Sequence, residues 1–93
     1  MADLQRIAQI LQDAAETHHT VYAITQGEDP DWASWYADWL LTLSDLPKML
    51  GTTPVRSELV WLLVQADKDG AADAEGKWQP AYAQRLVDRF GSA

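Results

Sequence analysis

The segment Glu16-Thr17-His18-His19 contains residue types that bind metals in other proteins. Its Glu-x-x-His spacing is the one used in di-metal carboxylate bundles. That chemistry needs a second such pattern and further glutamates, and the chain has no histidine outside this pair. A single metal held by one histidine and by acids from other helices stays open. Because no complete metal site can be built, we assign no metal ligand and expect no cofactor.

The acidic segment 67–77 invites comparison with a calcium-binding loop. Aligning Gly70 with the invariant glycine of that loop places three aspartates at its ligand positions: Asp67, Asp69 and Asp73. The first ligand position would then be Gln65, and the last would be Gly76 in place of the bidentate glutamate. We therefore expect a polar loop and not a calcium site.

Sequence patterns for catalysis are missing. There is no nucleophile elbow, phosphate-cradling glycine loop or dinucleotide fingerprint. The absence of cysteine excludes disulfides, thiolate metal sites and thiol catalysis. We identify no catalytic residue and expect a non-enzymatic protein. Catalysis would need an unfamiliar arrangement of His18, Tyr22 and Tyr36 with acids such as Asp38 or Glu58.

The clearest pattern in the chain is an aromatic stripe at residues 29–43. At about 100° per residue, its members fall within an arc of roughly 140° on a helix: Trp32, Trp35, Tyr36, Trp39, Leu40 and Leu43. Asp29 followed by Pro30 predicts the cap and the first position of this helix. We expect the stripe to anchor the domain's own core. The alternative is an aromatic platform with an acidic rim for a cationic or amphipathic partner.

His18 lies on the core-facing side of a predicted first helix that begins after the cap Asp3 and continues to about Thr25. A buried imidazole needs a hydrogen-bond partner, and we expect a tyrosine or an aspartate. Alternatively, His18 faces a ligand in a pocket formed with Tyr22, Tyr36 and tryptophans such as Trp39. The candidate ligand-binding or partner-binding residues are therefore His18, Tyr22, Trp32, Trp35, Tyr36 and Trp39.

The other elements follow from proline and glycine positions. Pro47 and Gly51 delimit a short helical turn, and Thr53 with Pro54 predicts the start of a third helix that continues to about Ala66. Residues 59–64 are apolar on every side, so periodicity alone cannot distinguish helix from strand there; the capping signal favours helix. A last helix covers about 80–90. We predict one all-α domain over 1–93, with four main helices and one short turn packed around the aromatic stripe and the helix at 54–66 in the middle.

Three segments are similar to a set of short bacterial proteins that have no assigned function. The segments are His-His-x-Val-Tyr-Ala from residue 18, Asp-Pro-Asp-Trp-Ala-Ser-Trp-Tyr-Ala-Asp-Trp-Leu from residue 29, and Pro-Val-Arg-Ser-Glu-Leu from residue 54. The resemblance covers roughly residues 18–60. It implies a compact stand-alone helical protein and carries over no activity, ligand or catalytic residue.

The charge distribution limits the partners. A net charge of −7 argues against nucleic acid and against anionic membrane surfaces, because both require clustered Lys and Arg. No apolar run approaches the ~20 residues of a membrane span, and the N-terminus lacks a signal peptide, so we expect a cytoplasmic protein. Residues 21–46 hold five acids and no base, which leaves a basic partner as an option.

Two of the predicted helices carry more apolar surface than one small domain is expected to bury. Leu41 lies opposite Trp32, and Trp61 and Val64 belong to the helix that is apolar on all sides. We expect Leu41, Trp61 and Val64 to form an interface in a homodimer or with another protein. The first hypothesis is thus a protein-interaction or dimerisation module. The alternative is a small-ligand or metal-binding protein with its pocket around His18, Tyr22, Tyr36 and Trp39.

Overall fold

Helices account for the regular structure of the computed structural model, which describes residues 3–25, 29–72 and 75–91. They are α1 (Leu4–Val21), α2 (Trp32–Thr42), α3 (Leu46–Leu50), α4 (Arg56–Lys68) and α5 (Trp78–Phe90), with a 3-10 turn, η1 (Ala23–Thr25), after α1. The described residues contain no strand, and 59–64 belong to α4. The prediction of an all-α fold with four main helices and one short turn is therefore confirmed. Within this part of the chain, no helix is long and apolar enough to cross a membrane.

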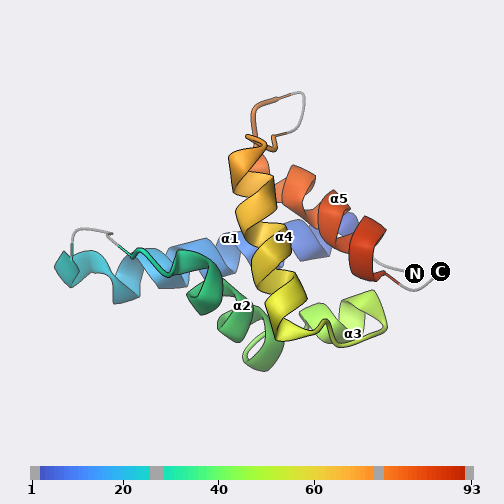
Figure 1. Cartoon of the computed structure of the whole chain (residues 1–93), viewed down its shortest axis with the longest axis horizontal. Coiled ribbons are helices and arrows are strands. Elements are labelled where there is room, and N and C mark those ends of the chain that lie inside the picture. The colour runs from blue at the N-terminus through green and yellow to red at the C-terminus, as the bar shows by residue number, and fades with distance from the viewer. Residues whose placement is uncertain (1–2, 26–28, 73–74, 92–93) are drawn as a thin grey trace.

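The helices cross one another around a shared core (Figure 1). In this view α4 passes in front of α1, and α2, α3 and α5 surround its lower end and right side. The most extensive helix contact joins α1 to α5, whereas α2 packs mainly against α4. The Cα radius of gyration is 12.6 Å, close to the value of about 12 Å expected for a compact domain of this length.

Aliphatic side chains fill the core. The largest fully buried ones come from all five helices: Ile7, Leu11, Leu40, Leu46, Leu50, Leu59, Leu63 and Leu86. In α2 the buried residues are Ala33, Ala37 and Leu40, while the aromatic side chains of the stripe are only partly buried at its edge. The stripe thus contributes Leu40 to the core and packs Trp32, Tyr36 and Trp39 against its edge, but the helices do not pack around the rings as predicted. Small alanines one turn apart let α2 approach its neighbours closely, and bulky rings would prevent this.

The position of α4 also differs from the prediction. Four of its residues are buried: Leu59, Leu62, Leu63 and Ala66. Trp61 is 56% exposed, so one side of the helix faces solvent and α4 is not the central element. The sequence did not predict this exposed side, because residues 59–64 are apolar at every position and their pattern does not indicate which side packs against the core.

Helix starts test the capping predictions directly. Asp3 caps α1 as predicted, since its Oδ1 accepts hydrogen bonds from the backbone N–H groups of Gln5 at 3.0 Å and Arg6 at 3.2 Å. The predicted starts at Asp29-Pro30 and Thr53-Pro54 are wrong, because α2 begins at Trp32 and α4 at Arg56. Asp29 accepts the backbone N–H of Asp31 just before α2 and also binds His18 of α1, and Pro54 is buried against the rest of the protein. Both residues therefore make tertiary contacts that the local sequence does not reveal.

Helix ends deviate less from the prediction. The first helix ends at Val21, and the 3-10 turn η1 follows it to Thr25, where the sequence placed the end of the helix. The short helix α3 ends as predicted at Gly51, whose φ of 77° is left-handed. The last helix begins at Trp78, two residues before its predicted start.

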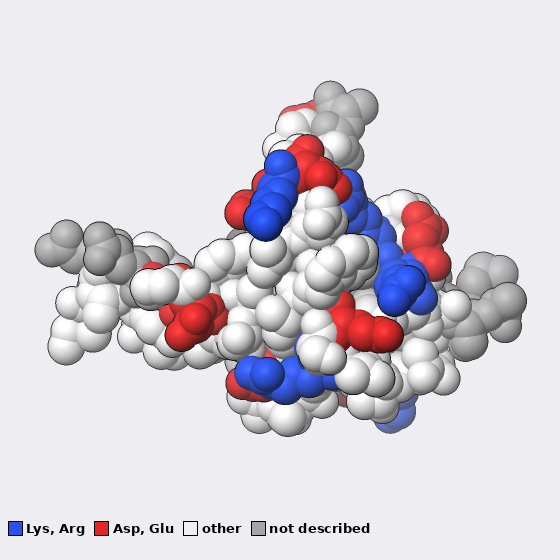
Figure 2. All heavy atoms as spheres, viewed as in Figure 1, with Lys and Arg blue, Asp and Glu red and all other residues white. Residues whose placement is uncertain are grey.

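Ion pairs connect the helices at the surface. Arg56 of α4 binds Asp38 of α2 with an Nε to Oδ1 distance of 2.6 Å, and Arg85 of α5 binds Asp69 at 2.9 Å. The hydrogen bond from Arg56 lowers the pKa of Asp38, and that from Arg85 lowers the pKa of Asp69. Figure 2 shows the resulting mixture of basic and acidic side chains over α4 and α5. Because these side chains are exposed to solvent, each pair contributes little to the stability of the fold.

Leu40→Ala is expected to lower the free energy of unfolding by about 2–5 kcal/mol, because it leaves a cavity at a fully buried position. Leu43→Ala is the matched control three residues further along, where the side chain is 71% exposed; its effect should stay within ~0.5 kcal/mol. Urea unfolding followed by circular dichroism measures both variants. Equal effects at the two positions would contradict the described packing of α2.

Candidate functional site

Three rings lie in a stack where the end of α1 meets the start of α2. The imidazole of His18 is stacked on the ring of Tyr22 with a centroid distance of 4.6 Å, and on the ring of Tyr36 at 5.2 Å. Trp35 approaches the same imidazole edge-on at 5.0 Å. Four of the predicted site residues, His18, Tyr22, Trp35 and Tyr36, therefore form one aromatic cluster.

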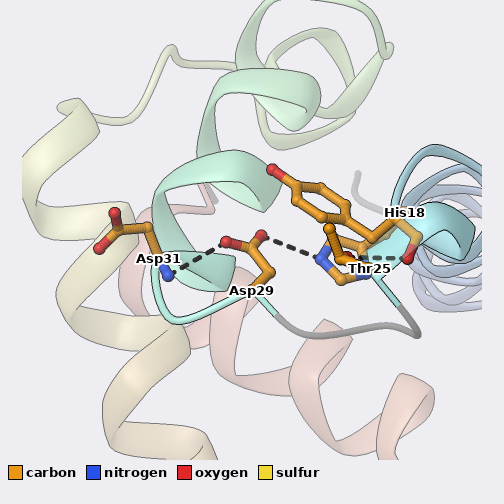
Figure 3. Close-up of polar contacts among 5 residues, drawn as sticks. His18, Thr25, Asp29 and Asp31 are labelled. Carbon is orange, nitrogen blue, oxygen red and sulfur yellow. Dashed lines mark hydrogen bonds and ion pairs between the residues drawn. The ribbon is translucent and has the colours of Figure 1, made fainter.

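A buried carboxylate orients this imidazole (Figure 3). Nε2 of His18 lies 3.0 Å from Oδ2 of Asp29, and the ring donates its N–H because an ionised carboxylate only accepts. The other carboxylate oxygen of Asp29 accepts the backbone N–H of Asp31 at 3.1 Å. The side chains of His18 and Asp29 are only 14% and 7% exposed. The prediction that His18 finds a partner such as an aspartate is confirmed.

The cluster borders an open pocket of about 540 Å³ between four helices. Its lining comes from α1, α2, α4, α5 and the residues that follow α4: Leu11, His18, Trp32, Tyr36, Leu63, Asp67, Gly70, Ala71, Trp78 and Tyr82. Four of these ten residues are tryptophan or tyrosine, and Leu11 and Leu63 are fully buried core residues. The pocket is therefore an aromatic cavity that reaches the hydrophobic core.

Two Trp-x-x-x-Tyr pairs supply the rings of this pocket. Trp32 and Tyr36 stand one turn apart on α2 with ring centroids 5.9 Å apart and planes at 80°. Trp78 and Tyr82 repeat the arrangement on α5 at 5.1 Å and 78°. Residues four apart on a helix lie on the same face, so each pair presents two ring planes at nearly a right angle.

The end of α4 forms one rim of the pocket. Gly70 adopts φ of 64°, and its N–H bonds to the carbonyl of Asp67 while the N–H of Ala71 bonds to the carbonyl of Ala66. This Schellman motif needs a left-handed residue, which is why glycine stands there. It ends the helix sharply and places Gly70 and Ala71 beside Asp67 in the pocket lining.

The charge around the pocket is negative. Among the residues that the structure places in its lining, Asp67 is acidic and none is Lys or Arg. Burial raises the pKa of Tyr82, and the charge of Asp67 raises it further. Burial likewise raises the pKa of Tyr36, with contributions from Tyr82 and Asp29. Both hydroxyl groups therefore stay neutral at neutral pH.

The remaining predicted site residues lie elsewhere. Tyr22 and Trp35 belong to the aromatic cluster around His18 but do not line the pocket. Trp39 lines a separate hollow of about 320 Å³ that also includes Arg6, Asp13 and Leu43. Of the interface candidates, Leu41 and Val64 are partly buried against the core, whereas Trp61 is exposed.

Sequence reasoning missed the acidic residue of the pocket, Asp67, and two of its four aromatic residues, Trp78 and Tyr82. Asp67 was considered only as a calcium ligand. The repeated Trp-x-x-x-Tyr spacing at 32–36 and 78–82 is a signal that could have linked the two helices to one site.

The metal-ligand candidates of the sequence do not come together in the part of the chain that the structure describes. No group of three or more His, Cys, Asp or Glu side chains suited to a metal occurs among the residues described. In the segment compared with a calcium loop, Gly70 ends a helix and Asp69 accepts hydrogen bonds from Gln65 and Arg85. Asp73 lies outside the described residues.

Alkaline pH should weaken the fold through the tyrosines. Because the folded protein raises the pKa of Tyr36 above its ordinary value of 10.0, the stabilisation from this residue is fully present below pH 10.0 and is lost as the pH rises through the folded-state pKa. We expect the tyrosinate absorbance of the folded protein to rise at higher pH than that of protein unfolded in guanidinium. Tyr36→Phe should reduce this stability loss. Coinciding titration curves would contradict the buried placement of the rings.

The site as a whole combines a buried His18–Asp29 pair, a ring stack and an aromatic pocket with one carboxylate in its lining. The ring stack and the pocket share His18 and Tyr36, so the stack forms one wall of the pocket.

Comparison of the chain with protein-family models, curated proteins and solved structures finds no match.

Proposed function

We propose that this protein is a non-enzymatic binding protein whose small organic ligand occupies the pocket between α1, α2, α4 and α5. The observation that carries the proposal is a cavity of about 540 Å³ with four aromatic side chains in its lining. Ligand sites in proteins are concave, measure roughly 300–1,000 Å³ and combine apolar walls with a few polar groups. Here the polar groups are His18, Asp67 and the hydroxyls of Tyr36 and Tyr82.

Preorganisation of the rings supports this proposal. Tyr82 is only 8% exposed, and Trp78 packs against it edge-on. Tyr36 is held between the imidazole of His18 and the ring of Trp32. Side chains that are already ordered lose little conformational entropy when a ligand arrives, so more of the contact energy becomes affinity.

Ala71→Leu is expected to weaken ligand binding on the order of tenfold, or ~1.4 kcal/mol, because the larger side chain enters the pocket from its rim. Ala72→Leu is the matched control, since the neighbouring alanine is exposed and is not in the lining. A fragment library of cationic, neutral and anionic compounds, screened by ligand-observed NMR, supplies the probe. Failure of every fragment to bind, or equal weakening by both variants, would overturn the pocket function.

A second proposal is a protein-interaction module that forms a homodimer or binds another protein, including a basic one. It is favoured by Trp61, which is 56% exposed on α4 with the guanidinium carbon of Arg89 5.8 Å from its ring centroid. Trp and Arg are enriched among the residues that dominate binding energy at interfaces. For either proposal, the cytoplasm is the location that we propose, as expected from the sequence.

Trp61→Ser should shift the protein from dimer to monomer if this second proposal holds, because it removes the largest exposed ring of α4. Ile24→Ser, at a side chain that is 92% exposed in η1, is the control for general loss of apolar surface. Sedimentation velocity over a range of micromolar concentrations measures the assembly. A wild-type protein that stays monomeric throughout would refute the homodimer.

A further inference from the structure

The ring geometry of the pocket suits a positively charged guest. The Trp32–Tyr36 pair and the Trp78–Tyr82 pair each set two ring planes at nearly a right angle, at 80° and 78°. Ring faces carry partial negative charge and attract cations within about 6 Å of the centroid, with Trp the most effective. Four rings from two helices line one cavity of about 540 Å³.

The charges in the lining favour the same sign. Asp67 is the acidic residue among the lining residues, and it is exposed to solvent in the last turn of α4. Its nearest basic neighbour in sequence, Lys68, is not in the lining, and neither is any other Lys or Arg of the described chain. An anionic guest would therefore meet a carboxylate and no compensating cation, whereas a cationic guest would gain a partner.

The mainly apolar lining of the pocket selects among cations. A primary ammonium carries three N–H donors that need acceptors once it is desolvated. The lining offers one carboxylate, two tyrosine hydroxyls and an imidazole whose Nε2 is already engaged by Asp29. An alkylated ammonium has few or no N–H groups and presents its charge through methyl groups, which pack directly on aromatic rings.

From this geometry we infer that the ligand of the proposed pocket is an alkylated ammonium compound, held by cation–π contacts with Trp32, Tyr36, Trp78 and Tyr82 and paired with the carboxylate of Asp67. The inference rests on the proposed ligand-binding function and names the chemical class of its ligand. The carboxylate of Asp67 makes the pocket select cations over anions, while the rings provide most of the contact surface.

Three soluble probes of nearly the same shape test this inference: choline, its neutral carbon isostere 3,3-dimethylbutan-1-ol, and the anion 3,3-dimethylbutanoate. Each is titrated into the full-length protein, and binding is measured by calorimetry and by tryptophan fluorescence, because Trp32 and Trp78 line the pocket. We expect saturable choline binding that is at least about tenfold tighter than that of the neutral alcohol. The anion should bind more weakly still.

Asp67→Asn and Asp88→Asn form a matched pair that changes the net charge equally. Asp88 is exposed on α5, accepts a hydrogen bond from Gln84 and is not in the pocket lining. Asp67→Asn should weaken choline binding about tenfold and leave the neutral alcohol unaffected, whereas Asp88→Asn should preserve both affinities. Equal choline affinities in the two variants would overturn the inference.

The outcomes separate the inference from the function on which it rests. If the neutral alcohol binds as tightly as choline, the pocket is a ligand site but the ammonium class is wrong. If fragments from the library bind while choline does not, the inference is likewise overturned and the pocket function stands. If neither choline nor any fragment binds, the proposed function fails and the inference fails with it.

Discussion

The hydrogen bond between His18 and Asp29 is the interaction on which the aromatic side of this protein depends. A carboxylate that is only 7% exposed must be paired, because desolvation of an unpaired charge is costly. His18 satisfies it from the end of α1, and the same carboxylate holds the chain just before α2 through Asp31. This contact sets the position in which Tyr36 stacks on the imidazole, and through Tyr36 it shapes one wall of the pocket.

The protein separates the parts that stabilise it from the parts available for binding. Leucine, isoleucine and alanine side chains fill the core, where small residues let helices approach and aliphatic shapes pack densely. Tyr82 belongs to this core, whereas Trp32, Tyr36, Trp39 and Trp78 stay at its margin, partly buried and partly accessible. Aromatic residues suit this margin because they combine a large contact area with few rotatable bonds. The stable core therefore holds the rings in place without covering them.

Local sequence signals predicted the elements well but their ends and contacts less well. Asp3 accepts two backbone N–H groups at the start of α1, while Asp29 divides its carboxylate between the N–H of Asp31 and the imidazole of His18. Pro54 likewise follows a good cap residue, yet it is buried and α4 begins two residues later. For the site, the aromatic cluster around His18 contains four predicted residues, but the pocket also needed Trp78 and Tyr82 from a helix 46 positions further along the chain than Trp32 and Tyr36.

The sequence by itself determined the helical class and the aromatic face of α2, because both follow from the periodicity of apolar residues. It also determined the short turn that ends at Gly51, because proline and glycine act within a few residues. The tertiary structure alone decided that the Trp-x-x-x-Tyr pairs of α2 and α5 line one cavity, and that Asp67 lies in it. Such contacts join residues far apart in the chain. They depend on how whole helices pack against the core, which no pattern within a single helix specifies.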